Sequence, residues 1–272
     1  MRVSTLLFSV STVLSLLACG GLGGEPPVEA PVVTGVTLAA FAPQVGERFA
    51  VTSSLDLDLN IEGEDASRHI KLVESAEGEV TVRTVTNGRL AEVNVRVTGG
   101  KTLSESPEGR TESLPDAVGR DYVVERGAGS DEHAVRTAAG EPVSDAEEAE
   151  LVRVLADEVF SERSDALLVN VGETVDIAQL FTAMDDDETI AGTLTLTLGV
   201  AAGGCGAPFD GSFSMSGTDD GMNISMSMTG SLCVDAASGA VSRADFSGPA
   251  KLANADVKGS GTARISSTVV RR

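Results

Sequence analysis

The chain has 272 residues, of which 41 are acidic and 20 are basic, and its formal net charge is −21. This acidity excludes a general nucleic-acid partner, because affinity for phosphate requires clustered Lys and Arg, and it disfavours adhesion to an anionic lipid surface. The apolar fraction of 42% is too high for a wholly disordered chain, and the length suffices for one or two domains with a sizeable core.

The first eighteen residues have the pattern of an export signal. Arg2 supplies a positive start, and the apolar run from Leu6 to Ala18 is shorter than the roughly 20 residues that a membrane-spanning helix needs. The run ends in Leu16-Leu17-Ala18-Cys19. This segment resembles the lipobox of bacterial lipoproteins, which has Leu three residues before an invariant Cys and a small residue directly before it.

The resemblance implies that residues 1–18 are a lipoprotein signal peptide, that cleavage follows Ala18, and that Cys19 is acylated. Several acyl chains on Cys19 would attach the protein stably to a membrane without a spanning helix. The alternative is an ordinary cleaved signal peptide next to an unmodified Cys19. Gly20 rather than Asp follows Cys19, which by the sorting rule of enteric bacteria favours the outer membrane of the bacterial cell envelope.

Residues 19–43 are then expected to be the lipidated Cys and a flexible tether rich in Gly and Pro. The segment Val32–Phe41 is more apolar, and it either belongs to the tether or docks as a first strand. Residues 44–272 are expected to form a β-rich domain.

Strict alternation over Phe49–Ile61 predicts a long strand with Leu55, Leu57 and Leu59 on its apolar face. Ile70–Glu74 is expected to be a short strand. Two further apolar segments flank Asn87-Gly88, which predicts a β-hairpin because both turn residues tolerate a positive φ. Residues 99–119 are rich in Gly, Ser, Glu and Pro and are predicted to be a loop.

The middle of the chain changes to a helical pattern. Ser144-Asp145-Ala146-Glu147 is typical of a capping box, and the apolar residues after it recur at helical spacing. We expect the main helix at about 145–161 and a shorter helix near Asp176–Met184.

The last third returns to alternating strands, and one of them places Met222, Ile224, Met226 and Met228 on a single face. The predicted fold class is therefore mainly β within a β-rich α+β architecture: an antiparallel sheet or half-barrel with one or two helices.

The domain could consist of two related halves, 45–143 and 170–272, joined by the helix. The suggestion comes from a short internal echo, because Gln44-Val45-Gly46-Glu47 resembles Asn170-Val171-Gly172-Glu173.

Acylation of Cys19 would leave Cys205 and Cys233 as a pair, which in an oxidising envelope predicts a disulfide. Two Cys residues with no neighbouring His or Cys are too few ligands for zinc. Asp58-x-Asn60-x-Glu62 imitates the start of a calcium loop, but position twelve is His69 rather than Glu. No metal or other cofactor is expected.

The sequence offers no catalytic motif. His69 and His133 lie far apart, and the Gly-x-Ser-x-Gly elbow of many hydrolases is absent. We therefore expect a protein that is not an enzyme. Three interpretations of the methionine face stay open: core packing in a chain without Trp, an apolar-ligand cavity, or a copper site built from thioethers.

The layout of tether, long amphipathic strands, mid-chain helix and a Val-Gly-Glu opening to the second half resembles uncharacterised bacterial lipoproteins. By architecture alone it is also similar to the envelope lipoprotein-carrier superfamily, in which helices cover a curved antiparallel half-barrel that holds acyl chains. The first hypothesis is a lipid-anchored envelope protein whose β-domain serves structure or interaction with another envelope protein. The second is a carrier of a lipid or other apolar ligand, and a hydrolase with a nucleophile beside either His is the third. The candidate ligand face consists of Leu55, Leu57, Leu59, Met222, Ile224, Met226 and Met228.

Overall fold

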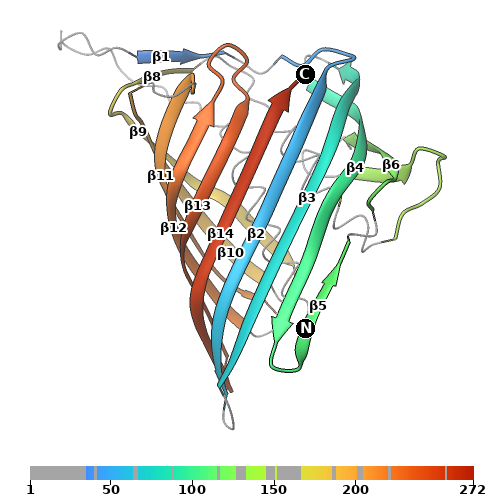
Figure 1. Cartoon of the computed structure of the whole chain (residues 1–272). Helices are drawn as coiled ribbons and strands as arrows, with labels where there is room; N and C mark the ends of the chain where they lie inside the picture. Colours follow the sequence, from blue (N-terminus) through green and yellow to red (C-terminus); the bar gives the residue numbers. More distant parts are fainter. Residues whose placement is uncertain are drawn as a thin grey trace.

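The computed structural model shows a long-stranded, strongly curved antiparallel sheet (Figure 1). No helix in the described part of the chain is long and apolar enough to cross a bilayer. Cys19 and the predicted signal peptide lie outside the described residues, as does the first part of the predicted tether. The structure describes residues 35–39, 42–63, 67–86, 89–114, 117–126, 133–144, 151, 167–185, 188–200, 205–219, 222–254 and 256–272.

The described residues form fourteen strands: β1 (Gly35–Leu38), β2 (Arg48–Gly63), β3 (Ser67–Thr86), β4 (Arg89–Ser106), β5 (Gly109–Ser113), β6 (Asp121–Arg126), β7 (His133–Thr137), β8 (Leu167–Asn170), β9 (Thr174–Asp185), β10 (Glu188–Leu198), β11 (Ala207–Asp219), β12 (Met222–Val234), β13 (Val241–Ala253) and β14 (Val257–Arg271). Twelve of them form one sheet in the order β7-β6-β4-β3-β2-β14-β13-β12-β11-β10-β9, with β5 paired to β4 off this path. Strands β1 and β8 form a separate pair. Every pairing is antiparallel, so the predicted mainly β, antiparallel fold is confirmed.

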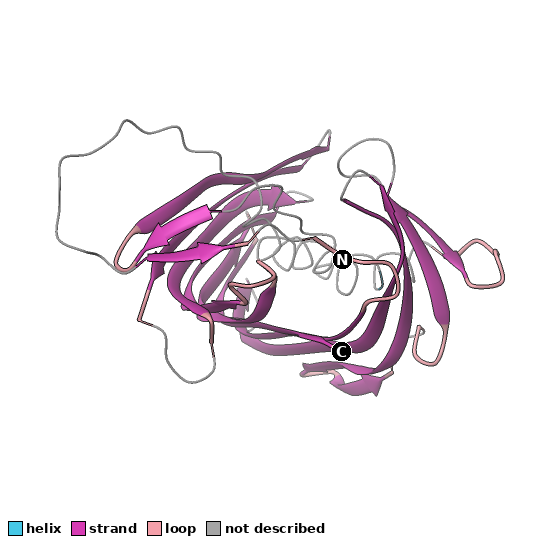
Figure 2. Ribbon diagram, turned by 90° about the horizontal axis from the view of Figure 1, so that it is seen from above, coloured by secondary structure: helices cyan, strands magenta, loops and turns pink. Residues whose placement is uncertain are grey.

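The large sheet bends into a U-shaped half-barrel whose two ends, β7 and β9, do not pair with each other (Figure 2). Glycines allow neighbouring strands to approach very closely within this bend. A Cβ at Gly230, Gly248 or Gly261 would lie 2.0, 2.1 or 1.8 Å from a carbonyl oxygen of the adjacent strand. Glycine at such points is a recognised means of building curvature into a sheet.

The inner face of the sheet carries two clusters of buried apolar side chains. Cluster 1 draws on β2 and on β10 to β14, and it also includes Leu38 of β1 and Val169 of β8. Cluster 2 draws on β2, β3, β4 and β6 and includes Phe49 and Tyr122. Strand β2 contributes to both clusters because it lies near the middle of the sheet, paired with β14 on one side and β3 on the other.

The strand predictions that rested on strict alternation are confirmed. Along β2, the odd-numbered residues from Phe49 to Leu59 are buried, and the residues between them are exposed or partly exposed. Strands β3 and β4 form the predicted hairpin, with Thr86 paired to Arg89. The two turn residues, Asn87 and Gly88, lie outside the described residues.

Three local predictions were wrong. Ile70–Glu74 is not a short strand but part of the 20-residue β3. Residues 99–119 are not one loop, because β4 continues to Ser106 by pairing with β3, and β5 returns beside it. This polar part of β4 carries little of the apolar alternation that marks a strand in sequence, so only the cross-strand pairing reveals it.

The prediction of a short helix near Asp176–Met184 was also wrong. This segment is β9, which pairs with β10 from Thr174 opposite Thr197 to Asp185 opposite Glu188. Pairing with the end of the sheet outweighs a weak local helical preference. The main helix expected at 145–161 lies outside the described residues except for Leu151, which is buried in cluster 2.

The short internal echo in the sequence corresponds to two turns with the same hydrogen bonds. In Gln44–Glu47 and in Asn170–Glu173, the Glu amide donates to the carbonyl of the first residue, and the Glu carboxylate accepts the amide of that residue. The glycines have φ values of 89° and 79°, and their amides donate to Val82 and Leu198 on the second strand of each half. A positive φ at the third position is typical of a type II turn. That the two halves are related stays a prediction.

Candidate ligand pocket beside the last strand

The candidate apolar-ligand face forms a single surface on the inner side of the sheet. Strands β2 and β12, which carry its residues, are separated in the sheet by β14 and β13. All seven residues belong to cluster 1 or pack against it, and Leu57 and Met228 are only 4% and 1% exposed. These side chains are thus packed within cluster 1. Among the described residues, a pocket lies further along the sheet.

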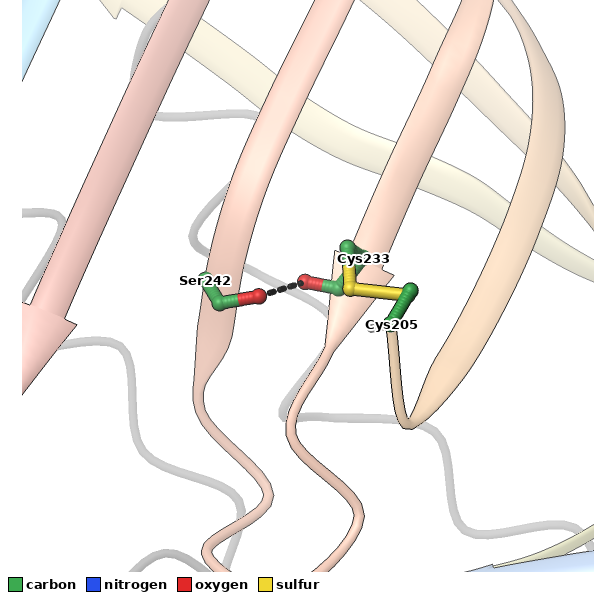
Figure 3. The surroundings of a disulfide bond; sticks show 3 residues. All are labelled: Cys205, Cys233 and Ser242. Carbon is green, nitrogen blue, oxygen red and sulfur yellow. Dashed lines mark hydrogen bonds between the residues drawn. A yellow bond between two sulfur atoms is a disulfide. The ribbon is translucent and has the colours of Figure 1, made fainter. Parts of the chain in front are cut away.

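The predicted disulfide between Cys205 and Cys233 is present, with an S–S distance of 2.02 Å (Figure 3). Cys205 precedes β11, and Cys233 is the second-last residue of β12. Cys233 stands between the buried residues Leu232 and Val234, so its side chain points to the outer face. The bond thereby fixes the start of β11 to the end of β12.

Strand β13 has a β-bulge opposite the end of β12, next to the disulfide. Cys233 pairs with Arg243, but the next residue, Val234, pairs with Val241, which leaves Ser242 as an extra residue. The Ser242 hydroxyl donates a hydrogen bond of 3.1 Å to the Cys233 carbonyl (Figure 3). Bulges of this kind bend a strand and increase its local twist.

The turn between β12 and β13, residues 235–240, is held by Asp235. Its two carboxylate oxygens accept the Ala237 amide at 2.9 Å and the Ser238 hydroxyl at 3.0 Å. Gly239 has a φ of 69°, which glycine adopts without strain. The carbonyl of Ala236 accepts the Ala39 amide, so the segment that follows β1 lies against this turn.

The bulge and the turn separate the start of β13 from the end of β14. The β13–β14 ladder ends at Arg243 opposite Thr268, whereas β14 stays paired with β2 as far as Arg271 opposite Phe49. A pocket of about 330 Å³ lies where the two strands diverge, near the end of the chain marked C in Figure 1. It is lined by Phe49, Asp235, Ser238, Ala240, Val241, Ser242, Val269, Val270 and Arg271.

The pocket connects the two core clusters. Phe49 belongs to cluster 2 and Val269 packs against that cluster, while Val241 packs against cluster 1. The walls are thus mainly apolar, and the polar groups are the two Ser hydroxyls, the Asp235 carboxylate and the Arg271 guanidinium. An apolar hollow with a few polar groups is the usual form of a small-molecule site.

Two ion pairs between an arginine and a glutamate lie at this end of the sheet. The Nη2 atom of Arg271 forms an ion pair with Oε1 of Glu47, a side chain that is 12% exposed. The other carboxylate oxygen of Glu47 accepts the Gln44 amide at 2.9 Å. Next to this pair, the Nη1 atom of Arg272 lies 2.6 Å from Oε1 of Glu79. The backbone amide of Arg272 donates to the Arg48 carbonyl.

The two histidines do not contribute to the pocket. His69 lies on β3 with its Nε2 atom 2.8 Å from Asp58 Oδ1, and both side chains are largely exposed. In the described part of the chain, no hydroxyl group hydrogen-bonds to His69, as a serine-hydrolase arrangement would require. His133 is the first residue of β7, at the far end of the sheet.

The described residues contain no group of three His, Cys, Asp or Glu side chains that could hold a metal ion. The groups of the described residues with a shifted pKa belong to ion pairs on exposed surfaces. A hydrogen bond from Arg136 lowers the pKa of Glu125, and a hydrogen bond that Arg264 donates to Asp245 raises the pKa of Arg264. Neither group lines the pocket, so these shifts reflect surface pairing rather than a reactive site.

Sequence reasoning found the disulfide and the apolar face but missed the pocket. The sequence pattern predicts Phe49 only as one residue of a strand, and it assigns no role to Arg271 or to the turn at Asp235. The run Asp-Ala-Ala-Ser-Gly at 235–239 is a turn signal that could have marked the turn. Its position beside the end of β14 follows only from strand pairing.

Comparisons with known proteins give no family. No family model matches the chain, and no curated protein matches it. A solved structure described as "lipid-protein interactions in lipovitellin" shares 9% identity, covering 84% of this chain and 25% of that one, with a TM-score of 0.46. DynF from the dynemicin biosynthesis pathway of Micromonospora chersina shares 9% identity over 93% of both chains, with a TM-score of 0.23. Neither likeness carries an argument about this chain.

Proposed function

We propose that this protein is a lipid-anchored protein of the bacterial cell envelope that binds an apolar ligand, such as an acyl chain, at the inner side of its curved sheet. The observation that supports this function is the pocket beside β14. Its volume of about 330 Å³ is within the range of ligand sites, and its apolar walls come from both core clusters. A bound chain would lie against Phe49, Val241 and Val269.

The proposed anchor supports this assignment. Cys19 precedes β1 by sixteen residues, which can span at most about 55 Å when extended. The residue after β1, Ala39, is hydrogen-bonded to the turn that lines the pocket. A lipid on Cys19 would therefore keep the pocket end of the domain within reach of the bilayer, from which an apolar ligand could be exchanged. By the sorting rule applied to Gly20, we propose the outer membrane.

Co-purifying ligand is the direct test. A Cys19→Ser variant of the full chain, exported and purified without detergent, should release a lipid on solvent extraction, detected by mass spectrometry. Val269→Trp, which fills the pocket, should abolish this lipid, whereas Thr262→Trp, on the exposed outer face of the same strand, should retain it. If Cys19→Ser without a further substitution has the mass of the ligand-free protein, ligand binding is rejected and a domain that serves structure or protein interaction is favoured.

The anchor is tested separately. Labelling cells with a radioactive fatty acid should mark the parent protein and not Cys19→Ser, and the variant should move from the membrane fraction to the soluble fraction. Retention of Cys19→Ser in the membrane fraction would show that another feature attaches the protein.

A further inference from the structure

Arg271 places a cation at the rim of an otherwise apolar hollow. We propose that the pocket selects amphiphiles with an anionic head, a carboxylate or a phosphate, and that Arg271 binds this head while the chain occupies the apolar walls. This inference rests on the proposed ligand-binding function and names the class of ligand.

The guanidinium of Arg271 has hydrogen-bond donors to spare. It carries five N–H groups, and in the described part of the chain its partner is Glu47, reached through Nη2. Arg264 offers the contrast, because both its Nε and its Nη2 donate to Asp245. The side chain of Arg271 is 52% exposed, so its remaining donors can meet a ligand at the pocket rim.

Glu47 acts as a positioning residue for this guanidinium. Its carboxylate is fixed on one side by the Gln44 amide of the tight turn and faces Arg271 with the other oxygen. Because Glu47 is largely buried, the ion pair holds the arginine head beside Phe49, its neighbour across the β2–β14 ladder. A donor that is already oriented loses less conformational entropy when an anion binds.

The other charge in the lining does not serve the same purpose. Both oxygens of Asp235 already accept hydrogen bonds from its own turn, from Ala237 and Ser238. Arg271 is thus the lining residue that offers charged donors toward a ligand. Carboxylates and phosphates match the planar fork of arginine and can form two parallel hydrogen bonds with it.

The test compares ligands that share one chain and differ in the head. Binding of dodecanoate, dodecyl phosphate and dodecan-1-ol to the full-length Cys19→Ser protein is measured by calorimetry, with acetate and inorganic phosphate as head-only probes. We expect dodecanoate and dodecyl phosphate to bind about tenfold more tightly than the alcohol, and the head-only probes to bind too weakly to detect. Strong binding of inorganic phosphate alone would overturn the proposal that the ligand is an amphiphile, and it would indicate a simple anion site.

The variants locate the effect. Arg271→Gln should weaken both anionic amphiphiles about tenfold and leave dodecan-1-ol unchanged, while Arg272→Gln, the adjacent arginine outside the pocket lining, should change neither. Because Arg271→Gln leaves Glu47 unpaired, the double variant Glu47→Gln, Arg271→Gln provides a second measurement in which no buried charge lacks a partner.

The outcomes separate this inference from the proposed function. If alcohol and acid bind equally and Arg271→Gln alters neither, the head selectivity is wrong while ligand binding stands. An equal loss in Arg272→Gln would also refute it, since the effect would then be one of general charge. If none of the three amphiphiles binds, the proposed function itself fails.

Discussion

Replacing Gly261 by alanine should destabilise the protein more than a surface substitution of the same kind. Gly261 lies on β14 opposite Leu59 of β2, and a Cβ on it would lie 1.8 Å from the Asp58 carbonyl oxygen. Real Cβ atoms essentially never come closer than 3.0 Å to such an atom. The two backbones must therefore move apart by about 1.2 Å, because neither atom belongs to a flexible side chain.

The magnitude follows from what this movement breaks. Ladder hydrogen bonds of about 2.9 Å would lengthen to about 4 Å, beyond a useful length. Losing about two of them costs about 2 kcal/mol, and local overpacking adds about 1–3 kcal/mol. The reduced flexibility of the unfolded chain returns about 0.4–1 kcal/mol. We expect a net loss of about 2–4 kcal/mol, which lowers Tm by about 5–15 °C for a domain of this size.

The assay is urea unfolding followed by circular dichroism, with Gly199→Ala as the matched control. A Cβ at Gly199 would meet its nearest atom, the Pro208 carbonyl oxygen, at 3.6 Å, an ordinary contact. The control should therefore be neutral or slightly more stable than the parent protein. Equal stability of the two variants would refute the argument that close strand approach at Gly261 is required for the curved sheet.

The remaining predictions concern the disulfide, the core and pH. Replacing both disulfide cysteines by serine opens a loop with a sequence separation of 28 and should cost about 3–4 kcal/mol, seen as a lower urea midpoint; an unchanged midpoint would contradict this. Met226→Ala, in the core, should cost about 2–5 kcal/mol, whereas Ser225→Ala, on the outer face, should change stability by less than about 0.5 kcal/mol; similar losses would show that the two faces are misassigned. Because Arg136 lowers the pKa of Glu125 in the folded state, their pair stabilises the protein above the ordinary Glu value of 4.5 and loses this effect as pH falls through the lowered pKa. The Tm difference between the parent and Arg136→Gln should thus shrink between pH 7 and pH 3, and a constant difference would count against it.

Patterns with a short period were predictable because they reflect which side of a strand is buried. The alternation along Phe49–Ile61 gave the buried face of β2 residue by residue. The cysteine count gave the disulfide once Cys19 was assigned to the anchor. Asn87-Gly88 gave the β3–β4 hairpin, since few dipeptides accept positive φ at both positions.

Segments without that period were mispredicted because their structure comes from distant partners. The polar end of β4 is a strand because β3 and β5 flank it, and Thr174–Asp185 is a strand because β10 supplies its hydrogen bonds. No window of local sequence contains those partners.

The sequence by itself determined the net acidity of the chain and the strands with one apolar face, and it predicts an export signal with a lipobox. Tertiary structure alone decided where a ligand could bind. The pocket exists because β14 pairs with β2, residues about two hundred positions apart, while a bulge at Ser242 turns β13 away. Side-chain periodicity records burial, which is local, whereas the gap between two strands depends on register and bulges across the whole sheet.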